Sequence, residues 1–332
     1  MKEANTDPTP QAKERPTEES AEPLPVEEAA DLAQRVIDNI EQVIVGQHDV
    51  AEHTLTTLLA GGHLLLEDVP GVGKTMLARS LARSIDCSFK RVQFTPDLLP
   101  SDVTGVNVFN QKSREFEFQP GPVFGNVVLA DEINRAPPKT QSALLEAMEE
   151  EQVTIDGETH EVPEPFTVVA TQNAVEQDRT YELPIAEIDR FMKKLSLGYP
   201  NPEQESEVLR RMVGEHPIRQ LDPVANVRDV LRAQETITNV TVEKPIRDYV
   251  TRLANYTRDH SRLGVSPRGS IAVLRAAQAR ATLRGRDYVI PDDVKTEAET
   301  VLSHRVRSES GAMGGEHGLT VVRNALDSVP VE

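Results

Sequence analysis

Residues 70–75, with the sequence PGVGKT, hold the groups that a phosphate-binding loop needs for nucleoside triphosphate chemistry. Gly71 and Gly73 would let the backbone curl close to an anion, and a helix that follows would point its positive N-terminus at that anion. Lys74 is the cation expected to pair with the β- and γ-phosphates, and Thr75 is the hydroxyl expected to ligate Mg²⁺. The predicted nucleotide contacts of this loop are Pro70, Gly71, Val72, Gly73, Lys74, Thr75 and Met76.

One position departs from the general pattern G-x-x-x-x-G-K-[ST], because Asp68 stands where the first glycine is expected. An aspartate tolerates unusual φ angles and can hydrogen-bond its own backbone, so it suits a residue that turns the chain at a strand exit. Its negative charge would nevertheless lie close to a bound anion. We therefore expect the Asp68 carboxylate to face away from the phosphates.

A second motif, VVLADE, places Asp131 and Glu132 at the end of an apolar run. Two acids leaving a buried strand are costly to place there without a cation or hydrogen-bond partners. For this segment alone, a solvated pair of acids is the alternative, but the phosphate-binding loop favours a metal site. We expect Asp131 to hold Mg²⁺, directly or through water, and Glu132 to polarise the water that attacks the γ-phosphate.

Three polar residues are weaker candidates. Asn173 ends the run FTVVATQN and is placed to reach the γ-phosphate or the attacking water, although an isolated asparagine is more often a turn former. Arg190 in IAEIDRF and Arg268 in GVSPRGS are ambiguous, because a surface arginine is usually solvated or in a modest ion pair. Arg268 lies near the start of a predicted helix, where the helix dipole disfavours a cation, and this suggests a specific anionic partner.

Strands and helices alternate around these motifs. Apolar runs typical of buried parallel strands are HLLLE, FKRVQF, NVVLADE and FTVVATQN. The segments KTMLARSLARSI and PPKTQSALLEAMEE each carry apolar residues on one helical face. This alternation predicts a parallel α/β sheet covered on both faces, and the carboxyl ends of its strands would bring the two motifs to one crevice.

The chain divides into four predicted parts. Residues 1–30 carry five prolines and few large apolar residues, so we expect a disordered acidic tail. The nucleotide-binding sheet domain is expected over residues 31–200, interrupted by an excursion at 100–120 and a hairpin at 152–162 with Asp156 and Gly157 at its turn. Helices predicted at 203–213, 243–260, 268–284 and 291–306 form an all-α domain over 201–310. Residues 311–332 are expected to be a flexible tail.

The composition restricts the classes of partner. The 332 residues include 54 acidic and 36 basic ones, for a net charge of −18, and such a surface repels nucleic acid as a whole. A local basic stripe would remain an exception, and a salt-adapted cytoplasm would also favour this acidity. No apolar run approaches the ~20 residues of a membrane span, and the N-terminus lacks the apolar core of a secretory signal. We expect a cytoplasmic protein without a membrane span.

Four segments, in this order and spacing, resemble the MoxR family of AAA+ ATPases: HLLLEDVPGVGKT, GPVFGNVVLADEINRAPPKTQSALLEAMEE, VVATQN and LPIAEIDRF. The likeness covers roughly residues 33–305 and implies a P-loop AAA+ αβα sandwich followed by an all-α lid, assembled into a homo-oligomeric ring, usually a hexamer, that uses ATP and Mg²⁺. It assigns Lys74 and Thr75 to Walker A, and Asp131 and Glu132 to Walker B.

The resemblance also assigns roles to the weaker candidates. Asn173 matches the sensor-1 asparagine, and Arg190 matches the arginine finger that reaches the nucleotide of a neighbouring subunit. Arg268 matches the sensor-2 arginine of the lid. Gly46 and Gln47 match the segment that packs near adenine.

Members of the family are thought to act as chaperone-like ATPases that mature or activate partner complexes, often with a von Willebrand factor A domain protein. Two alternatives stay open at this point, an ATPase motor stimulated by nucleic acid and the ATPase subunit of a metal-insertion complex like magnesium chelatase. A nucleotide-binding scaffold without hydrolysis is disfavoured, because Glu132 and both arginines are present.

Overall fold

The computed structural model describes residues 22–173, 181, 183–214, 216–307 and 315–331. At its centre is a five-stranded sheet in which all neighbouring strands run parallel, in the order β2-β5-β8-β1-β9. The strands are β1 (Leu64–Asp68), β2 (Phe89–Gln93), β5 (Val127–Asp131), β8 (Thr167–Asn173) and β9 (Lys193–Leu195). The first four are the predicted ones. The sequence analysis did not find β9, which has only three residues.

Helices cover both faces of this sheet, as predicted, because successive strand residues point to opposite sides. Leu64 and Leu66 of β1 face a core shared with helices α1, α2 and α3, whereas Leu65 faces a core shared with α5. The bounds of these helices are α1 (Val26–Glu41), α2 (His48–Leu59), α3 (Lys74–Ser84) and α5 (Pro138–Glu150). The three layers form the αβα sandwich of the nucleotide-binding domain.

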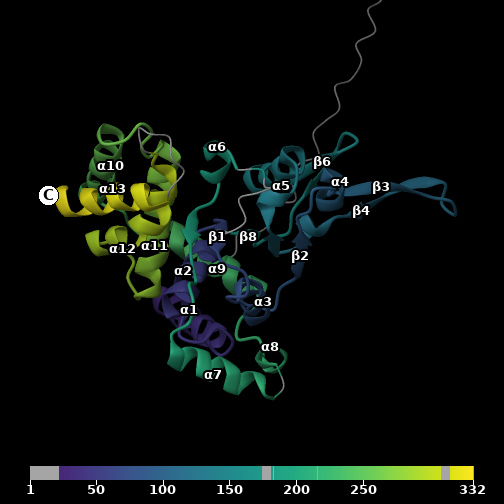
Figure 1. The fold of residues 1–332 in the computed structure, drawn as a ribbon, viewed down its shortest axis with the longest axis horizontal. Helices are drawn as coiled ribbons and strands as arrows, with labels where there is room; N and C mark the ends of the chain where they lie inside the picture. Colours follow the sequence, from purple (N-terminus) through teal and green to yellow (C-terminus); the bar gives the residue numbers. More distant parts are fainter. Residues whose placement is uncertain (1–21, 174–180, 182, 215, 308–314, 332) are drawn as a thin grey trace, which may run out of the picture.

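Two antiparallel hairpins interrupt the alternation of strands and helices. The first follows the short helix α4 (Pro100–Thr104) and consists of β3 (Gly105–Asn110) and β4 (Glu115–Pro120), which project away from the body of the molecule (Figure 1). The second consists of β6 (Gln152–Ile155) and β7 (Glu158–Glu161). Its turn has Asp156 at φ 52° and Gly157 at φ 88°, the two positive angles of a type I′ turn. Shorter elements are η1 (Pro122–Phe124), η2 (Ile133–Arg135) and α6 (Ile185–Ile188).

The boundary predicted at residue 201 is not where the helical domain separates from the sheet domain. Helices α7 (Pro202–Met212), α8 (Pro217–Gln220) and α9 (Val227–Thr238) follow the sheet, and α9 was not predicted. Val230, Ala233 and Ile237 of α9 belong to the core formed with α1, α2 and α3. Arg211 of α7 donates to the backbone carbonyls of α1 and its end. Amphipathic helices at this point therefore complete the nucleotide-binding domain instead of starting the next one.

The separate helical domain, here called the lid, contains α10 (Lys244–Asp259), α11 (Pro267–Leu283), α12 (Pro291–Leu302), η3 (Ser303–Arg305) and α13 (Gly315–Ser328). These helices share one core. The predicted flexible tail over 311–332 is corrected by α13, whose residues Val321, Val322 and Ala325 are buried against the other lid helices. Apolar residues three and four apart form this buried stripe, and the Gly and Ser content of the segment concealed it.

The predicted tail at the N-terminus is corrected in its last part. Helix α1 begins at Val26, inside the range 1–30, and both Leu24 and Ala29 are buried. Residues 1–21 lie outside the described part of the chain. Among the residues that are described, no helix has the length and apolarity needed to cross a bilayer.

Candidate nucleotide site and a distant arginine cluster

The phosphate-binding loop joins the end of β1 to the start of α3. Gly71 has φ 87° and Gly73 has φ 103°, angles in the left-handed region that favours glycine. Lys74 is the first residue of α3, so the loop lies at the N-terminus of an eleven-residue helix. Backbone N–H groups and the positive end of the helix dipole therefore face the same space, which suits an anion.

The Lys74 ammonium is held inside the loop. Its Nζ donates to the backbone carbonyl of Asp68 at 2.8 Å and to that of Val69 at 3.2 Å. Burial lowers the pKa of Lys74, and the carboxylates of Asp68, Asp131 and Glu132 partly offset this effect. The structure thus brings the predicted lysine near both predicted acids.

Asp68 is buried, and its carboxylate points toward the segment that follows β9. The Oδ2 atom accepts from the backbone N–H of Leu197 at 2.6 Å and of Gly198 at 2.8 Å, and from Ser196 Oγ at 3.0 Å. The Oδ1 atom accepts from the N–H of Val69 at 2.9 Å. This agrees with the expectation that the carboxylate faces away from the phosphates, because three of its four donors lie in residues 196–198, beyond the end of β9.

Gly46 and Gln47 lie beside the same segment. Gln47 Nε2 donates to the carbonyl of Leu197 at 2.9 Å, and Gly46, at φ 68°, presents its carbonyl to Gln204 of α7 at 3.0 Å. Because Leu197 also donates to Asp68, residues 196–198 connect the predicted adenine segment to the phosphate-binding loop.

The acids Asp131 and Glu132 end β5 at the same edge of the sheet. Thr171 of the neighbouring strand β8 donates from Oγ1 to Asp131 Oδ1 at 2.7 Å and accepts from the N–H of Glu132 at 2.8 Å. Glu132 has φ 55°, an uncommon angle for a residue with a side chain. The Asp131 and Glu132 backbone is therefore fixed by β8, and Asn173 lies farther along β8, paired with Asp68 in the sheet register.

Two arginines neutralise these two acids, and a glutamine lies between the ion pairs. Arg91 of β2 contacts Asp131 Oδ2 at 2.7 Å, and Arg135 contacts Glu132 Oε2 at 2.7 Å. Gln93 connects the two pairs, since it accepts from Arg91 at 2.9 Å and donates to Glu132 Oε2 at 2.6 Å. Arg91 and Arg135 are both substantially exposed, so these contacts can be exchanged for nucleotide or metal.

The donor set at this edge fits Mg²⁺. Thr75 is the second residue of α3 and carries a hydroxyl oxygen. Asp131 ends β5 and carries a carboxylate, whose charge partly offsets the lowering of the Lys74 pKa by burial. Oxygen ligands are those that Mg²⁺ prefers, and this ion typically uses one or two protein ligands beside water and phosphate oxygens. In the described ranges, no cluster of three or more His, Cys, Asp or Glu residues offers a different metal site.

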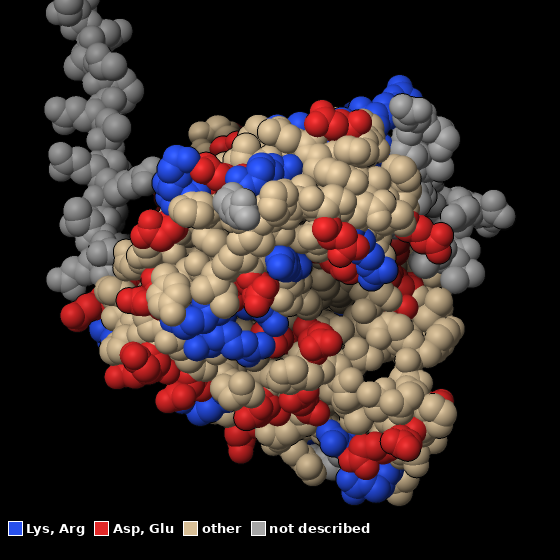
Figure 2. Space-filling model, turned by 90° about the vertical axis from the view of Figure 1, so that its left-hand side faces the viewer, with Lys and Arg blue, Asp and Glu red and all other residues tan. Residues whose placement is uncertain are grey.

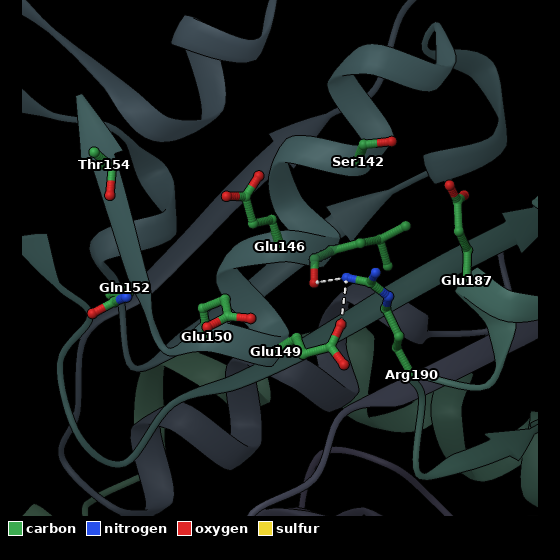
Figure 3. Close-up of a pocket in the computed structure, with 9 residues that line it drawn as sticks. Ser142, Glu146, Glu149, Glu150, Gln152, Thr154, Glu187 and Arg190 are labelled. Atoms are coloured by element: carbon green, nitrogen blue, oxygen red, sulfur yellow. Dashed lines mark hydrogen bonds and ion pairs between the residues drawn. The ribbon is translucent and has the colours of Figure 1, made fainter. Parts of the chain in front are cut away.

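The remaining two candidates, Arg190 and Arg268, are brought together at another place. Arg190, which follows α6, donates from Nη1 to the carbonyl of Leu145 at 2.7 Å and contacts Glu149 Oε2 at 2.9 Å (Figure 3). Arg268, in the first turn of α11, contacts Glu149 Oε1 at 3.0 Å. The anionic partner expected for Arg268 is thus Glu149, near the C-terminal end of α5.

This arginine cluster lies at the opposite end of the sheet from the phosphate-binding loop. His63 precedes β1, and its Nε2 donates to the carbonyl of Met148, while its Nδ1 accepts from the N–H of Val168 at the start of β8. Met148 and Glu149 are therefore at the amino ends of the strands whose carboxyl ends carry Lys74 and Asn173. At a rise of 3.3 Å per residue, the two ends of β1 are about 15 Å apart.

The lid fixes the backbone that carries Arg190. Arg305, whose side chain is almost fully buried, donates from Nε to Asp189 Oδ1 at 2.6 Å and from Nη2 to the carbonyl of Phe191 at 2.8 Å. Ser266, the N-cap of α11, donates to Asp189 Oδ2 at 3.1 Å. A Cβ at Gly269 would lie 2.7 Å from Arg305 Cδ, so glycine is needed for Arg305 to pass the start of α11.

Comparison with known proteins agrees with this arrangement. A model of the AAA family, "ATPase family associated with various cellular activities", matches residues 63–193, and an AAA lid domain model matches residues 253–322. The chain is 52% identical over 303 residues to YeaC of Bacillus subtilis, covering 90% of this chain and 95% of that protein. It is 43% identical over 304 residues to Chaperone MoxR1 of Mycobacterium tuberculosis, covering 88% of this chain and 80% of that protein.

The chain belongs to the MoxR family of AAA+ ATPases. A crystal structure of a Cytophaga hutchinsonii protein described as an ATPase has a TM-score of 0.84 to it, with 39% sequence identity, covering 92% of this chain and 96% of that one. The MoxR-family chain accordingly binds nucleotide and hydrolyses ATP.

Sequence reasoning missed several residues that contact the predicted ones. These residues of the MoxR-family chain are Arg91, Gln93, Glu149, Thr171, Asp189 and Arg305. One signal was available for the first two, because they are polar residues two apart within a strand predicted to be buried. For the others, only the strand register and the docking of the lid bring the partners together.

Proposed function

We propose that the chain forms a ring, with six copies as the expected number, and binds ATP between neighbouring subunits. The observation that supports this is the separation of Lys74 and Asp131 from Arg190 and Arg268, at opposite ends of β1 and β8. The two ends of β1 are about 15 Å apart, so arginines at the amino end lie away from a γ-phosphate held at the carboxyl end of the same subunit. In a ring, one edge of each subunit meets the other edge of its neighbour, and the two sets complete one site.

Each subunit supplies the groups that bind and activate. The backbone N–H groups of residues 70–76 hold the phosphates, and Lys74 Nζ exchanges the carbonyls of Asp68 and Val69 for phosphate oxygens. Gly46 and Gln47 lie against adenine. Thr75 and Asp131 would hold Mg²⁺, which when bound would neutralise charge on the phosphate oxygens.

Glu132 activates the water that attacks the γ-phosphate. For this role its carboxylate must leave Gln93 and Arg135, orient the water and take up the proton released as the water oxygen bonds to the γ-phosphorus and the bond to the bridging oxygen of ADP breaks. Asn173 helps to place the water. The left-handed backbone of Glu132 (φ 55°) is an uncommon conformation of the kind that clusters at active sites, which supports this assignment.

The neighbouring subunit supplies the positive charge for the transition state. Arg190 and Arg268 reach the γ-phosphate of the adjacent copy, and the lid holds the Arg190 backbone through Asp189 and Arg305. An arginine supplied in this way raises the rate by roughly 10³–10⁵. A chain that is not assembled should therefore hydrolyse ATP slowly.

The output of the cycle is the remodelling of a protein client, with a von Willebrand factor A domain protein as the expected class of partner. The name of the relative Chaperone MoxR1 supports this direction. The β3–β4 hairpin supports it as well, because Phe109 and Phe116 on its tip are 50% and 71% exposed. Exposed aromatic side chains on a projecting hairpin are suited to contact with another protein.

A variant of Glu132 tests the proposal that this residue activates the attacking water. Glu132→Gln should keep ATP binding, measured by calorimetry, and should abolish ATP turnover. Glu158→Gln, on the exposed β6–β7 hairpin, removes the same charge and should leave both unchanged. Normal hydrolysis by Glu132→Gln would refute the assignment.

The same variant should also identify the client protein, because a chain that binds ATP without hydrolysing it should keep its client bound. Protein captured by Glu132→Gln in the presence of ATP, and not captured by Lys74→Ala, is expected to contain a von Willebrand factor A domain. Capture of a tetrapyrrole-binding protein would favour metal insertion instead. Stimulation of ATPase activity by DNA would favour a nucleic-acid motor; on the lid face shown in Figure 2, the described basic residues lie among acidic ones and form no continuous stripe.

A further inference from the structure

Glu149 connects the two arginines that the proposed ring would present to a neighbour. Its Oε2 contacts Arg190 Nη1 at 2.9 Å and its Oε1 contacts Arg268 Nη1 at 3.0 Å. Figure 3 shows the Arg190 guanidinium pointing at α5, where Glu149 and the carbonyl of Leu145 receive it. One carboxylate thus uses both oxygens to hold two cations from different domains.

The two ion pairs are open to exchange. The side chains of Arg190, Glu149 and Arg268 are 28%, 37% and 44% exposed, and pairs with this exposure are weak in water. The backbone under them is fixed, since Arg305 and Ser266 hold Asp189. The anchors of the arginines are therefore rigid, while the anion between them is replaceable.

Four acids line the pocket beside the arginine pair, Glu146, Glu149, Glu150 and Glu187, and of these Glu149 contacts both arginines. The Arg190 and Arg268 guanidiniums flank one carboxylate, whereas the third arginine nearby, Arg305, is paired with Asp189 at 2.6 Å. Two cations that share a single replaceable acid form an anion site already filled from within. A γ-phosphate carries more negative charge than a carboxylate and presents more oxygens, so it can displace Glu149.

We propose that Glu149 is an internal stand-in for the neighbour's γ-phosphate, which keeps Arg190 and Arg268 paired in the free chain and competes with nucleotide-dependent assembly. This rests on the proposed function, in which both arginines act on an adjacent copy. On assembly, each guanidinium exchanges a Glu149 oxygen for a phosphate oxygen, and the carboxylate turns to solvent in the pocket of about 450 Å³ that it lines with Arg190. Glu149 therefore sets the chain concentration at which the ring forms.

The test measures ATPase activity per chain against chain concentration, using the full chain with saturating MgATP. Glu149→Gln should lower the concentration of half-maximal activity by about 3- to 10-fold, the range that two exposed ion pairs provide, with kcat at saturation within about 2-fold of the parent. Sedimentation velocity with ATP, in the Glu132→Gln background, should show the same shift in assembly without turnover. Glu149→Asp keeps the negative charge, so its concentration of half-maximal activity should lie close to that of the parent chain.

The matched control is Glu146→Gln. Glu146 lines the same pocket one turn earlier on α5 but takes no part in the two ion pairs, so its removal should shift the curve by less than about 2-fold. In an Arg268→Gln background, the shift caused by Glu149→Gln should shrink.

Three outcomes contradict the proposal. An equal shift for both glutamates would mean that only the general charge of the pocket matters. A higher half-maximal concentration, or a reduced kcat with no shift, would make Glu149 a structural support of the arginines. If the parent chain shows no dependence on concentration at all, the ring function fails first, and the proposal for Glu149 fails with it.

Discussion

Two clusters of opposite charges join the lid to the nucleotide-binding domain, and they differ in burial. In the buried cluster, Lys193 of β9 contacts Glu297 of α12 at 2.6 Å, and both side chains are 0% exposed. In the arginine cluster, Arg190, Glu149 and Arg268 all remain in contact with solvent. The same kinds of group thus appear once where water is excluded and once where it is not.

The buried cluster is held from both domains. Glu297 also contacts His53 of α2 at 3.3 Å and Arg280 of α11 at 3.2 Å, and Arg280 contacts Glu52 of α2 at 3.0 Å. Burial alone would raise the pKa of Glu297, but Lys193 and His53 lower it to about 2. The Glu297 carboxylate is buried and contacts Lys193, His53 and Arg280, so it has little access to an outside partner and holds the lid in one orientation.

Burial, rather than charge, separates a structural role from an exchangeable one. Breaking a buried pair leaves an uncompensated charge, whereas breaking an exposed pair leaves two solvated groups. The buried cluster should therefore control stability, and the arginine cluster should control turnover. Four substitutions or conditions test this division.

The largest effect is expected from Arg190→Ala. ATPase activity should fall by roughly 10³ or more, because the transition-state charge loses its partner, while the free energy of unfolding should change little. Mixing this variant with Glu132→Gln subunits should restore part of the activity. The control Arg323→Ala removes an exposed arginine paired with Glu299 and should keep full activity. Absence of rescue in confirmed mixed rings would contradict action on a neighbour.

Next in size is the loss of stability in Lys193→Met. Glu297 would be left buried without its closest cation, at a cost of roughly 3–5 kcal/mol in the free energy of unfolding, measured by urea denaturation. Adding Glu297→Leu should recover at least half of the loss, because an apolar pair of similar volume needs no partner. A loss below about 1 kcal/mol would place the two clusters in the same class.

As the pH falls, the buried histidines near the arginine cluster should lose their contribution to the free energy of unfolding first. The buried cluster should lose its contribution only at lower pH. Burial, with a contribution from Arg268, lowers the pKa of His63 to about 4, and burial also lowers the pKa of His304. A group with a depressed pKa in the folded state supports stability above its unfolded pKa of about 6.5, and this support is lost as the pH falls toward 4. His63 should account for roughly 2 kcal/mol by pH 5.

The same pH titration distinguishes the buried cluster from these histidines. Since the pKa of Glu297 is about 2, its contribution is lost only below about pH 4.5, its ordinary range. His63→Gln should flatten the fall in stability between pH 6.5 and 5, and the double variant Lys193→Met with Glu297→Leu, which removes both members of the buried pair, should not. If stability falls with pH in His63→Gln as it does in the parent chain, the fall does not come from the His63 imidazole.

The smallest effect is expected from Glu149→Gln on stability. Its two ion pairs are exposed, so the free energy of unfolding should change by less than about 1 kcal/mol, although assembly shifts. Glu297→Gln is the matched variant in the buried cluster and should cost several times more. Equal costs would remove the distinction between the clusters.

Local patterns in the sequence were sufficient for the nucleotide edge of the sheet. Gly71, Gly73 and Lys74 lie within four residues, and Asp131 with Glu132 ends an apolar run, so neighbours along the chain define both motifs. The apolar runs and helical periodicity also predict the parallel sheet and most of its helices. The orientation of Asp68 followed from its charge alone, because an acid beside phosphates must turn away.

Contacts between distant segments were decided only by the tertiary structure. Thr171 meets Asp131 through the register of β5 and β8, and Glu149 meets Arg268 because the lid docks at the amino ends of the strands. The helix of residues 315–328 and the early start of α1 depend on packing against surfaces that local composition does not reveal. Sequence patterns report the neighbours within one element, whereas pairing across elements depends on how the packed layers close around their cores.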